Sequence, residues 1–227
     1  MKNFKTTILC FLVTGLTFAQ EAITKQVGEF TSVKTFDKIT VELIKSKENK
    51  VELTGTDNDF AELINNNGEL KIKMSAKKLL KGDKVVAKVY HTKDIYEVIA
   101  TEGTKVTSHD TFSTVDLNLS AKEGAEIVLT DDVKKVTGNV NSGGKITLEG
   151  KADNQDYLAN SGGIIRAQNL KSSQCNVTAN AGGDAYVTAT ELVDAKVRAG
   201  GAITIYGQPR VLNEKKVIGG KITKIVK

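Results

Sequence analysis

Apolar and polar residues alternate in short runs through the second half of the chain. Residues 145–148 (KITL), 184–187 (DAYV) and 202–205 (AITI) each carry an apolar side chain at every second position. Side chains of a β-strand point alternately to opposite faces, so this pattern predicts short strands with one buried face. A similar run precedes each of them, for example residues 196–199 (KVRA). The sequence therefore predicts an all-β fold built from many short strands.

Pairs of glycines separate these runs at a nearly constant interval. The pairs begin at positions 143, 162, 182, 200 and 219, so that successive pairs lie 19, 20, 18 and 19 residues apart. Gly124 and Gly103 extend the series toward the N-terminus, and the glutamates before them are interpreted as replacing the first glycine. A leucine-rich repeat has a similar period, but leucine is too sparse here. The period therefore favours a β-solenoid with about 19–20 residues per coil.

Each glycine pair is interpreted as a point where the backbone of a coil turns with positive φ. Gly163→Val is then expected to destabilise the fold strongly, because a β-branched residue is poorly suited to that conformation. The paired glycines of successive coils should stack in a line at a spacing of about 5 Å. Each coil bonds only to its neighbours, so stability accumulates along the stack.

An asparagine precedes three of the glycine pairs by two residues. These are Asn141, Asn160 and Asn180, which a solenoid would place one above another. Stacked amides can form a hydrogen-bonded ladder, and asparagine tolerates left-handed backbone. The alternative is a catalytic or sugar-binding row, which Arg198 and Val217 would end in the later coils. We favour the structural ladder.

The N-terminal third lacks the glycine period, although alternation continues, for example at residues 70–74. Residues 59–65 (DFAELIN) space their apolar side chains as a short helix would. A solenoid needs an atypical terminal repeat to cover its exposed end, so this region is interpreted as a cap. No proline- or serine-rich linker interrupts the chain. We therefore expect one domain over residues 20–227, with the cap at about 30–95 and regular coils at about 96–227.

Residues 1–19 have the pattern of a cleaved secretory signal peptide. Lys2 and Lys5 precede an apolar stretch that ends in a small residue at the expected cut. The alternative, a membrane anchor, is disfavoured because the apolar run is shorter than the roughly 20 residues that span a bilayer. Cleavage removes Cys10 and leaves Cys175 alone, which excludes an internal disulfide. We interpret Cys175 as a buried, inert thiol.

The charge balance excludes nucleic acid as an expected partner. Without the two signal lysines the formal charge falls from +5 to +3, because 30 basic residues face 27 acidic ones. Such a weak and scattered excess is not the footprint of a nucleic-acid-binding protein. Aromatic residues form only 5% of the chain and tryptophan is absent, which disfavours stacking platforms for sugars or bases.

No motif of a known catalytic or metal centre is present in the sequence. Asp131 and Asp132 are comparable with the clustered acids of polysaccharide-cleaving β-helices, but one coil later only Asp153 is near. The pair is therefore interpreted as a solvated turn. His91 and His109 are 18 residues apart, and they would stack only if a further coil preceded the turn at Gly103. Because the glycine period does not establish that coil, the two histidines do not predict a metal site. We predict no catalytic, cofactor-binding or metal-binding residue and no cofactor.

Several short motifs together resemble a known family. They are residues 36–39 (FDKI), Gly68-Glu69 leading into residues 70–72 (LKI), and the serial turns NSGG, NSGG, NAGG, RAGG and IGG. In this combination, residues 36–226 resemble the family "putative auto-transporter adhesin, head GIN domain" of exported Bacteroidetes proteins. The resemblance implies a right-handed β-helix-like fold and a secreted or cell-envelope location. It supplies no catalytic residues.

Two functional hypotheses follow. The favoured one is an exported, non-enzymatic protein, periplasmic, surface-exposed or secreted, whose solenoid faces bind an unknown protein or glycan partner without a transmembrane anchor in the mature chain. The alternative is a polysaccharide-active β-helix enzyme or a carbohydrate-binding module. A cluster of carboxylates or basic residues in a groove across three or more coils would favour the alternative, whereas a featureless polar face would not.

Overall fold

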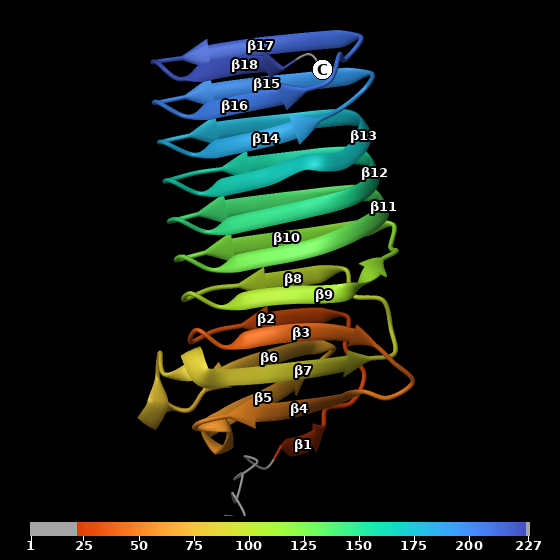
Figure 1. Cartoon of the computed structure of the whole chain (residues 1–227), viewed down its shortest axis with the longest axis vertical. Helices are drawn as coiled ribbons and strands as arrows, with labels where there is room; N and C mark the ends of the chain where they lie inside the picture. The colour runs from red at the N-terminus through yellow and green to blue at the C-terminus, as the bar shows by residue number, and fades with distance from the viewer. Residues whose placement is uncertain (1–21, 226–227) are drawn as a thin grey trace, which may run out of the picture.

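The computed structural model describes residues 22–225 and has the form of a flattened β-solenoid whose strands stack along one axis (Figure 1). Eighteen strands are linked by hydrogen bonds into one continuous sheet, and the only helices in the described residues are three single-turn 3-10 helices. The all-β solenoid expected from the glycine period is confirmed.

Except for residues 75–84, the strands follow one another through short connections. The strands of the first half are β1 (Ile23–Gln26), β2 (Ser32–Thr35), β3 (Thr40–Lys45), β4 (Lys50–Gly55), β5 (Ala61–Asn66), β6 (Glu69–Met74), β7 (Val85–His91), β8 (Glu97–Ala100) and β9 (Lys105–Phe112). Those of the second half are β10 (Asp116–Lys122), β11 (Glu126–Asn141), β12 (Lys145–Ala159), β13 (Ile164–Asn180), β14 (Asp184–Thr188), β15 (Leu192–Arg198), β16 (Ala202–Tyr206), β17 (Val211–Val217) and β18 (Lys221–Ile225). The 3-10 helices are η1 (Asn58–Phe60), η2 (Ala76–Lys78) and η3 (Gly82–Lys84).

Each regular coil has one strand before its turn and one after it, and these strands form two facing layers. The first layer contains the strands that precede the turns, in the order β6-β2-β8-β10-β11-β12-β13-β15-β17. The second layer contains those that follow, in the order β7-β3-β9-β11-β12-β13-β14-β16-β18. The long strands β11, β12 and β13 belong to both layers, because each passes round the corner opposite the turns (Figure 1).

The inward side chains of the two layers form one continuous core. A typical row runs through neighbouring coils as register partners, and each member is at most 1% exposed: Ile127, Ile146, Ile165, Ala185 and Ile203. Full burial of a large aliphatic side chain contributes roughly 1.5–3 kcal/mol relative to exposure. Because every coil repeats such rows, each coil is stabilised mainly by the two beside it.

The turns that join the layers place two residues in succession in the left-handed region. In the turn at residues 141–144, Ser142 has φ +49° and Gly143 has φ +74°. The same arrangement recurs at Ser161-Gly162, Ala181-Gly182, Ala199-Gly200 and Ile218-Gly219. Adjacent turns are hydrogen-bonded, for example from the Gly143 amide to the Ser161 carbonyl at 3.2 Å. The expected stacking of the glycine turns is therefore confirmed.

In the first four pairs the second glycine is required for a reason other than the expected one, whereas Gly220 in the fifth pair has the expected positive φ, at +97°. Gly163 does not have positive φ, so that part of the interpretation was wrong. A Cβ atom built there would lie 2.8 Å from the Val140 Cγ2 atom and 2.9 Å from the Val140 carbonyl carbon. At Gly144 the corresponding distance to the Ala121 oxygen is 2.1 Å. The second glycine is needed because the preceding coil passes too close for any side chain.

The single glycines align with the first position of the pair, not the second. Gly124 has φ +74° and follows Glu123 at φ +54°, as Gly143 follows Ser142. Ala125 stands directly before the strand, where later coils carry the second glycine. The turn around Gly103 has the same arrangement. The interpretation that the glutamates replace the first glycine is thus wrong, since they take the place of serine or alanine.

At the N-terminal end, chain order and spatial order differ. The coil of β2 and β3 lies between the coil of β6 and β7 and that of β8 and β9. The chain therefore first forms the second coil of the stack, with β2 and β3. It then forms the terminal coil, with β6 and β7, and continues with the third coil, which contains β8 and β9. Three antiparallel pairings occur there, β1 with β4, β4 with β7, and β5 with β6. These strands cover the end of the core.

The short helix expected at residues 59–65 is wrong. Only η1 forms, and residues 61–66 are the strand β5, which pairs with β6 through a tight turn at Asn67 (φ +51°) and Gly68 (φ +86°). Ala61 is buried against the core, and Leu63 packs beside it. Backbone pairing with an existing strand has overridden the local apolar spacing, which suits either element over so short a run.

In the described residues, the C-terminal end of the stack is not covered by additional strands. Its last coil carries charged side chains at inward positions instead. In the last coil Glu214, Lys216 and Lys224 occupy the register positions that hold buried apolar side chains in the preceding coil. Charged residues at inward positions of an edge strand oppose pairing with another chain. The two ends of the solenoid are thus protected in different ways.

Candidate functional site

A cavity of about 290 Å³ opens where the N-terminal end of the stack meets the regular coils. Its cause is an irregularity in β9. β3 pairs with β9 only as far as Ser108, and β9 then carries two additional residues before it rejoins β11 at Thr111. The residues after the end of β7 form the other wall. Three neighbouring strands, β3, β7 and β9, therefore contribute side chains to one hollow.

His91 ends β7 at the floor of this junction cavity. Its side chain is buried, and its ring centroid lies 6.4 Å from that of Phe30. The Nδ1 atom lies 2.8 Å from the Lys93 carbonyl oxygen, which can only accept, so Nδ1 carries the hydrogen. Burial lowers the pKa of His91, which keeps the ring neutral at pH 7. The Nε2 atom is consequently an acceptor, and it has no partner among the described residues.

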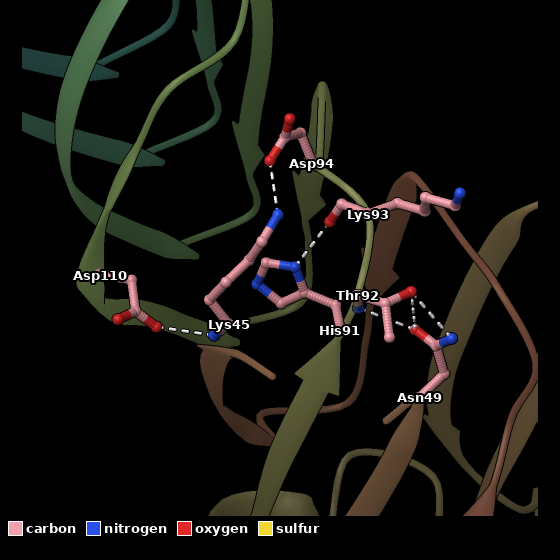
Figure 2. Close-up of polar contacts among 7 residues, drawn as sticks. All are labelled: Lys45, Asn49, His91, Thr92, Lys93, Asp94 and Asp110. Carbon is pink, nitrogen blue, oxygen red and sulfur yellow. Dashed lines mark hydrogen bonds and ion pairs between the residues drawn. The ribbon is translucent and has the colours of Figure 1, made fainter. Parts of the chain in front are cut away.

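Lys45, at the end of β3, connects the two acidic groups of the cavity (Figure 2). Its ammonium group lies 2.5 Å from the Asp94 Oδ1 atom, and its backbone amide donates to Asp110 Oδ2 at 2.6 Å. The Nε2 edge of His91 faces the side on which Lys45 and Asp110 lie (Figure 2). Lys45 and Asp94 retain side-chain exposures of 44% and 66%, so a ligand can reach both.

A second set of hydrogen bonds fixes the loop that holds His91. The Thr92 amide donates to the Asn49 Oδ1 atom at 3.0 Å, and the Asn49 side-chain amide donates to the Thr92 hydroxyl at 3.1 Å (Figure 2). Asn49 precedes β4, so this contact ties the residues after β7 to the end of the stack. It thereby sets the position of the Lys93 carbonyl and the orientation of the imidazole.

The cavity combines apolar walls with groups of both charges. Ile95 and Phe112 supply buried apolar surface beside one ammonium group, two carboxylates and a neutral imidazole. Such a site can orient a ligand that carries several donors and acceptors. No group of three or more metal-binding side chains occurs among residues 22–225. The imidazole makes no hydrogen bond to a hydroxyl or thiol there, so the cavity has no preformed nucleophile–base pair.

The two histidines are not brought together. β3 lies between β7 and β9, and the His109 side chain is exposed on the irregular part of β9. Sequence reasoning considered His91 only as a metal ligand. It missed the cavity, because the cavity depends on the pairing of β3 with both β7 and β9.

The interpretation of residues 131–132 as a solvated turn is wrong, because both lie within β11 and only Asp132 is exposed to solvent. Asp132 is exposed, whereas Asp131 is 1% exposed and neither carboxylate oxygen has a hydrogen-bond partner in the described residues. β11 continues through this corner without a turn, so alternation directs Asp131 inward. Burial raises the pKa of Asp131 from 3.8 to about 7.

The asparagine row forms only in part. The Asn180 side-chain amide donates to the Asn160 Oδ1 atom at 2.9 Å, which confirms one rung of the predicted ladder. Asn141 is exposed and instead accepts a hydrogen bond from the Ser142 amide of its own turn at 2.8 Å.

A second polar row lies on the outer face of the first layer. There Asn176 donates to Asp156 at 3.1 Å, and Asn213 donates to Asp194 at 2.5 Å. These carboxylates are thus bound within the row itself.

Cys175 points to the opposite face, where it is buried beside Val177 and Ala179, and burial raises the pKa of its thiol. The prediction of a buried thiol is confirmed.

The protein is thus a β-solenoid with a hollow where its N-terminal end meets the regular coils. The model of the family "Putative auto-transporter adhesin, head GIN domain" matches residues 29–209, and the chain belongs to this family. The resemblance inferred from the sequence is confirmed. No curated protein sequence matches the chain.

Solved structures share the fold at low sequence identity. A "putative adhesin" from Bacteroides fragilis is 22% identical with a TM-score of 0.81, and the match covers 90% of this chain and 97% of that one. A "putative adhesin" from Parabacteroides distasonis is 20% identical with a TM-score of 0.70, covering 90% and 96%. A "putative lipid binding protein" from the same organism is 15% identical with a TM-score of 0.68, covering 92% and 98%. At these identities the likeness establishes the fold alone.

Family membership accords with an exported protein, and the predicted signal peptide lies outside the described residues. Within residues 22–225, no helix has the length and apolar character that crossing a membrane requires.

Proposed function

We propose that this protein is an exported, non-enzymatic binding protein of the bacterial cell envelope, and that the junction cavity holds a hydroxyl-rich group such as one sugar unit of a glycan. Membership of an adhesin family supports a binding role. The observation that carries the proposal is the unpartnered Nε2 acceptor of His91 beside the exposed Lys45–Asp94 pair.

The composition of the cavity favours a small polar ligand. Its volume of about 290 Å³ lies at the lower end of small-ligand sites, which are typically about 300–1,000 Å³. Sugar hydroxyls both donate and accept, so they can bind the Asp94 carboxylate and the Lys45 ammonium together. Phe112 and Ile95 offer apolar contact to the C–H face of a sugar ring.

One observation favours the second candidate, a polysaccharide-active enzyme. Asp94, Asp110 and His91 come from a groove formed by neighbouring coils, which is where such an enzyme would place acid and base groups. We rank it second because Asp94 is bound by the Lys45 side chain and Asp110 by the Lys45 amide.

A glycan array combined with a panel of polysaccharide lyase and hydrolase assays tests both candidates. We expect glycan binding without turnover, and a loss of affinity of about tenfold or more for Asp94→Asn and for Lys45→Gln, because each removes one charged hydrogen bond. Glu191→Gln is the matched control, since Glu191 is also an exposed, ion-paired carboxylate but lies far along the stack. Turnover of any polymer would reject the non-enzymatic role, and equal binding by all variants would reject the cavity.

A further inference from the structure

The turn between β6 and β7 differs from every other turn that joins the two layers. The regular coils use four residues, whereas residues 75–84 (SAKKLLKGDK) form an extended loop that contains η2 and η3. This loop projects from the side of the solenoid near its N-terminal end (Figure 1). It precedes β7, and the junction cavity follows β7, so the two features lie at opposite ends of that strand.

Two leucines at the tip of this loop are exposed. Leu79 is 57% exposed and Leu80 is 47% exposed, and Ile64 of β5 nearby is 38% exposed. Together with Phe36 they line a shallow hollow of about 450 Å³. Single exposed apolar residues are common on protein surfaces, but a contiguous group marks an interaction site.

The backbone holds the leucines outward at an energetic cost. Leu80 has φ +58°, a left-handed conformation that is unfavourable for a residue with a bulky side chain. The buried Asp37 carboxylate enforces it, because its two oxygens accept hydrogen bonds from the Leu80 and Met74 amides, each at 2.9 Å. The Gly82 amide also donates to the Asp37 carbonyl at 3.0 Å. Strain that neighbouring groups maintain in this way is characteristic of functional segments.

Lysines surround the exposed leucines. The loop contains four lysines and one aspartate. Lys78 is paired with Asp57 at 3.2 Å, whereas Lys77, Lys81 and Lys84 are exposed and form no ion pair with any described residue. Lys71, Lys73 and Glu102 border the same hollow, and Lys73 is paired with Glu62 at 3.0 Å.

We propose that this loop docks the protein on a lipid bilayer that contains anionic phospholipids. The leucines would enter the boundary between headgroups and acyl chains, while the unpaired lysines contact lipid phosphates. Charge complementarity argues for this partner, because the unpaired Lys77, Lys81 and Lys84 lie in the same loop as the exposed leucines, and cations beside an apolar tip match the layered chemistry of an anionic membrane surface. Each lysine near such a surface strengthens the attraction to the anionic headgroups. The inference goes beyond the proposed glycan-binding function and concerns a separate surface.

Vesicle co-sedimentation tests the proposal with the chain from Gln20 onward, which contains every described residue and lacks the N-terminal apolar segment. The probes are vesicles of phosphatidylcholine mixed with phosphatidylglycerol and vesicles of phosphatidylcholine alone. We expect binding to the anionic vesicles only, weakened by high salt. Leu79→Ser combined with Leu80→Asn should lower the partition coefficient about tenfold or more, and so should Lys77, Lys81 and Lys84 changed together to Gln.

Matched variants separate the loop from general effects. Ile218→Asn removes an aliphatic residue that is 85% exposed at φ +56° in the last turn, and it should bind as the unchanged chain does. Lys122, Lys151 and Lys171 changed together to Gln lower the net charge equally elsewhere, with little expected loss. Because asparagine tolerates left-handed backbone, Leu80→Asn should not impair folding, which thermal unfolding checks.

Four results would overturn the proposal. They are absence of binding to anionic vesicles, equal binding by the leucine variant, equal loss in the matched controls, and self-association of the chain that the leucine variant abolishes. The last result would assign the surface to a second copy of the chain.

Discussion

The regular coils and the N-terminal end solve the same problem of reversing the chain between two layers, but they do so with different chemistry. In the coils from β11 onward, a left-handed residue and two glycines make the turn, with little need for side-chain hydrogen bonds. At the N-terminal end, the turn at Asp37 and Lys38 has two left-handed residues that are not glycine. There the Asp37 carboxylate accepts hydrogen bonds from the amides of Met74, at the end of β6, and of Leu80, in the loop that follows.

The difference shows what each arrangement permits. A glycine turn leaves little room for variation, because the adjacent coil lies where a Cβ atom would stand. A turn supported by side chains can hold long, irregular segments, such as residues 75–84, in a fixed position. The irregular end accordingly contains both the junction cavity and the lysine-rich loop.

The largest effect is expected from Gly163→Val, which tests the steric requirement of the regular coils. The new side chain would collide with the side chain and backbone of Val140, so we expect the free energy of unfolding to fall by roughly 5 kcal/mol or more. Chemical denaturation provides the measurement. Gly162→Asn is the control, because a Cβ at Gly162 meets nothing within 4 Å and asparagine accepts its φ of +72°. Similar losses for both variants would contradict the distinction between the two glycines.

Asp131 tests how the regular core tolerates a buried carboxyl group. Its pKa is about 7 in the folded chain against 3.8 in the unfolded one, so the folded chain binds more protons between these values. This contribution to the free energy of unfolding is present below about pH 4 and is lost as the pH rises to about 7. The total change is on the order of 4 kcal/mol.

Asp131→Asn should therefore be more stable than the unchanged chain at pH 8, with the advantage disappearing near pH 4. Denaturation of both proteins across this range measures the difference. The lowered pKa of His91 also makes stability depend on pH, but it affects both proteins equally. A constant difference at all pH values would show that Asp131 does not titrate in this window.

Asp37→Asn tests the side-chain support of the N-terminal end. Asparagine keeps the left-handed backbone but places an NH2 group against one of the two amides that Asp37 binds. We expect a loss of about 2 kcal/mol in the free energy of unfolding and faster proteolysis within residues 75–84. Asp83→Asn, an exposed change in the same loop, should have little effect. Equal stability of the two variants would remove the assigned role of Asp37.

The smallest effect on stability is expected at the C-terminal end. Lys216→Val combined with Lys224→Val should change the free energy of unfolding by less than about 1 kcal/mol, yet it removes the inward charges that protect the edge. We expect concentration-dependent self-association in analytical ultracentrifugation. Lys215→Val, an outward position of the same strand, is the control. A monomeric double variant would indicate that the edge is protected by other means.

Periodic features were predictable from the sequence, and non-local ones were not. The stacked coils follow from glycines repeated every 18–20 residues, because each coil repeats the same local requirement. Residues 59–65 were assigned wrongly because a run of seven residues fits a helix or a strand, and only its pairing with β6 decides. Asp131 was misplaced because its neighbours suggested a turn, whereas β11 continues through the corner.

The sequence alone was sufficient for the class of fold, the period of the coils and the family, because these depend on contacts between residues one period apart. Tertiary structure alone decided that β3 lies between β7 and β9, and hence that Lys45, His91 and Asp110 surround one cavity. It also decided that Asp37 holds two leucines in solvent. Lys45 and Asp110 are 65 residues apart, and Asp37 and Leu80 are 43 residues apart; neither separation is a single coil period, so only the path of the folded chain brings these pairs together.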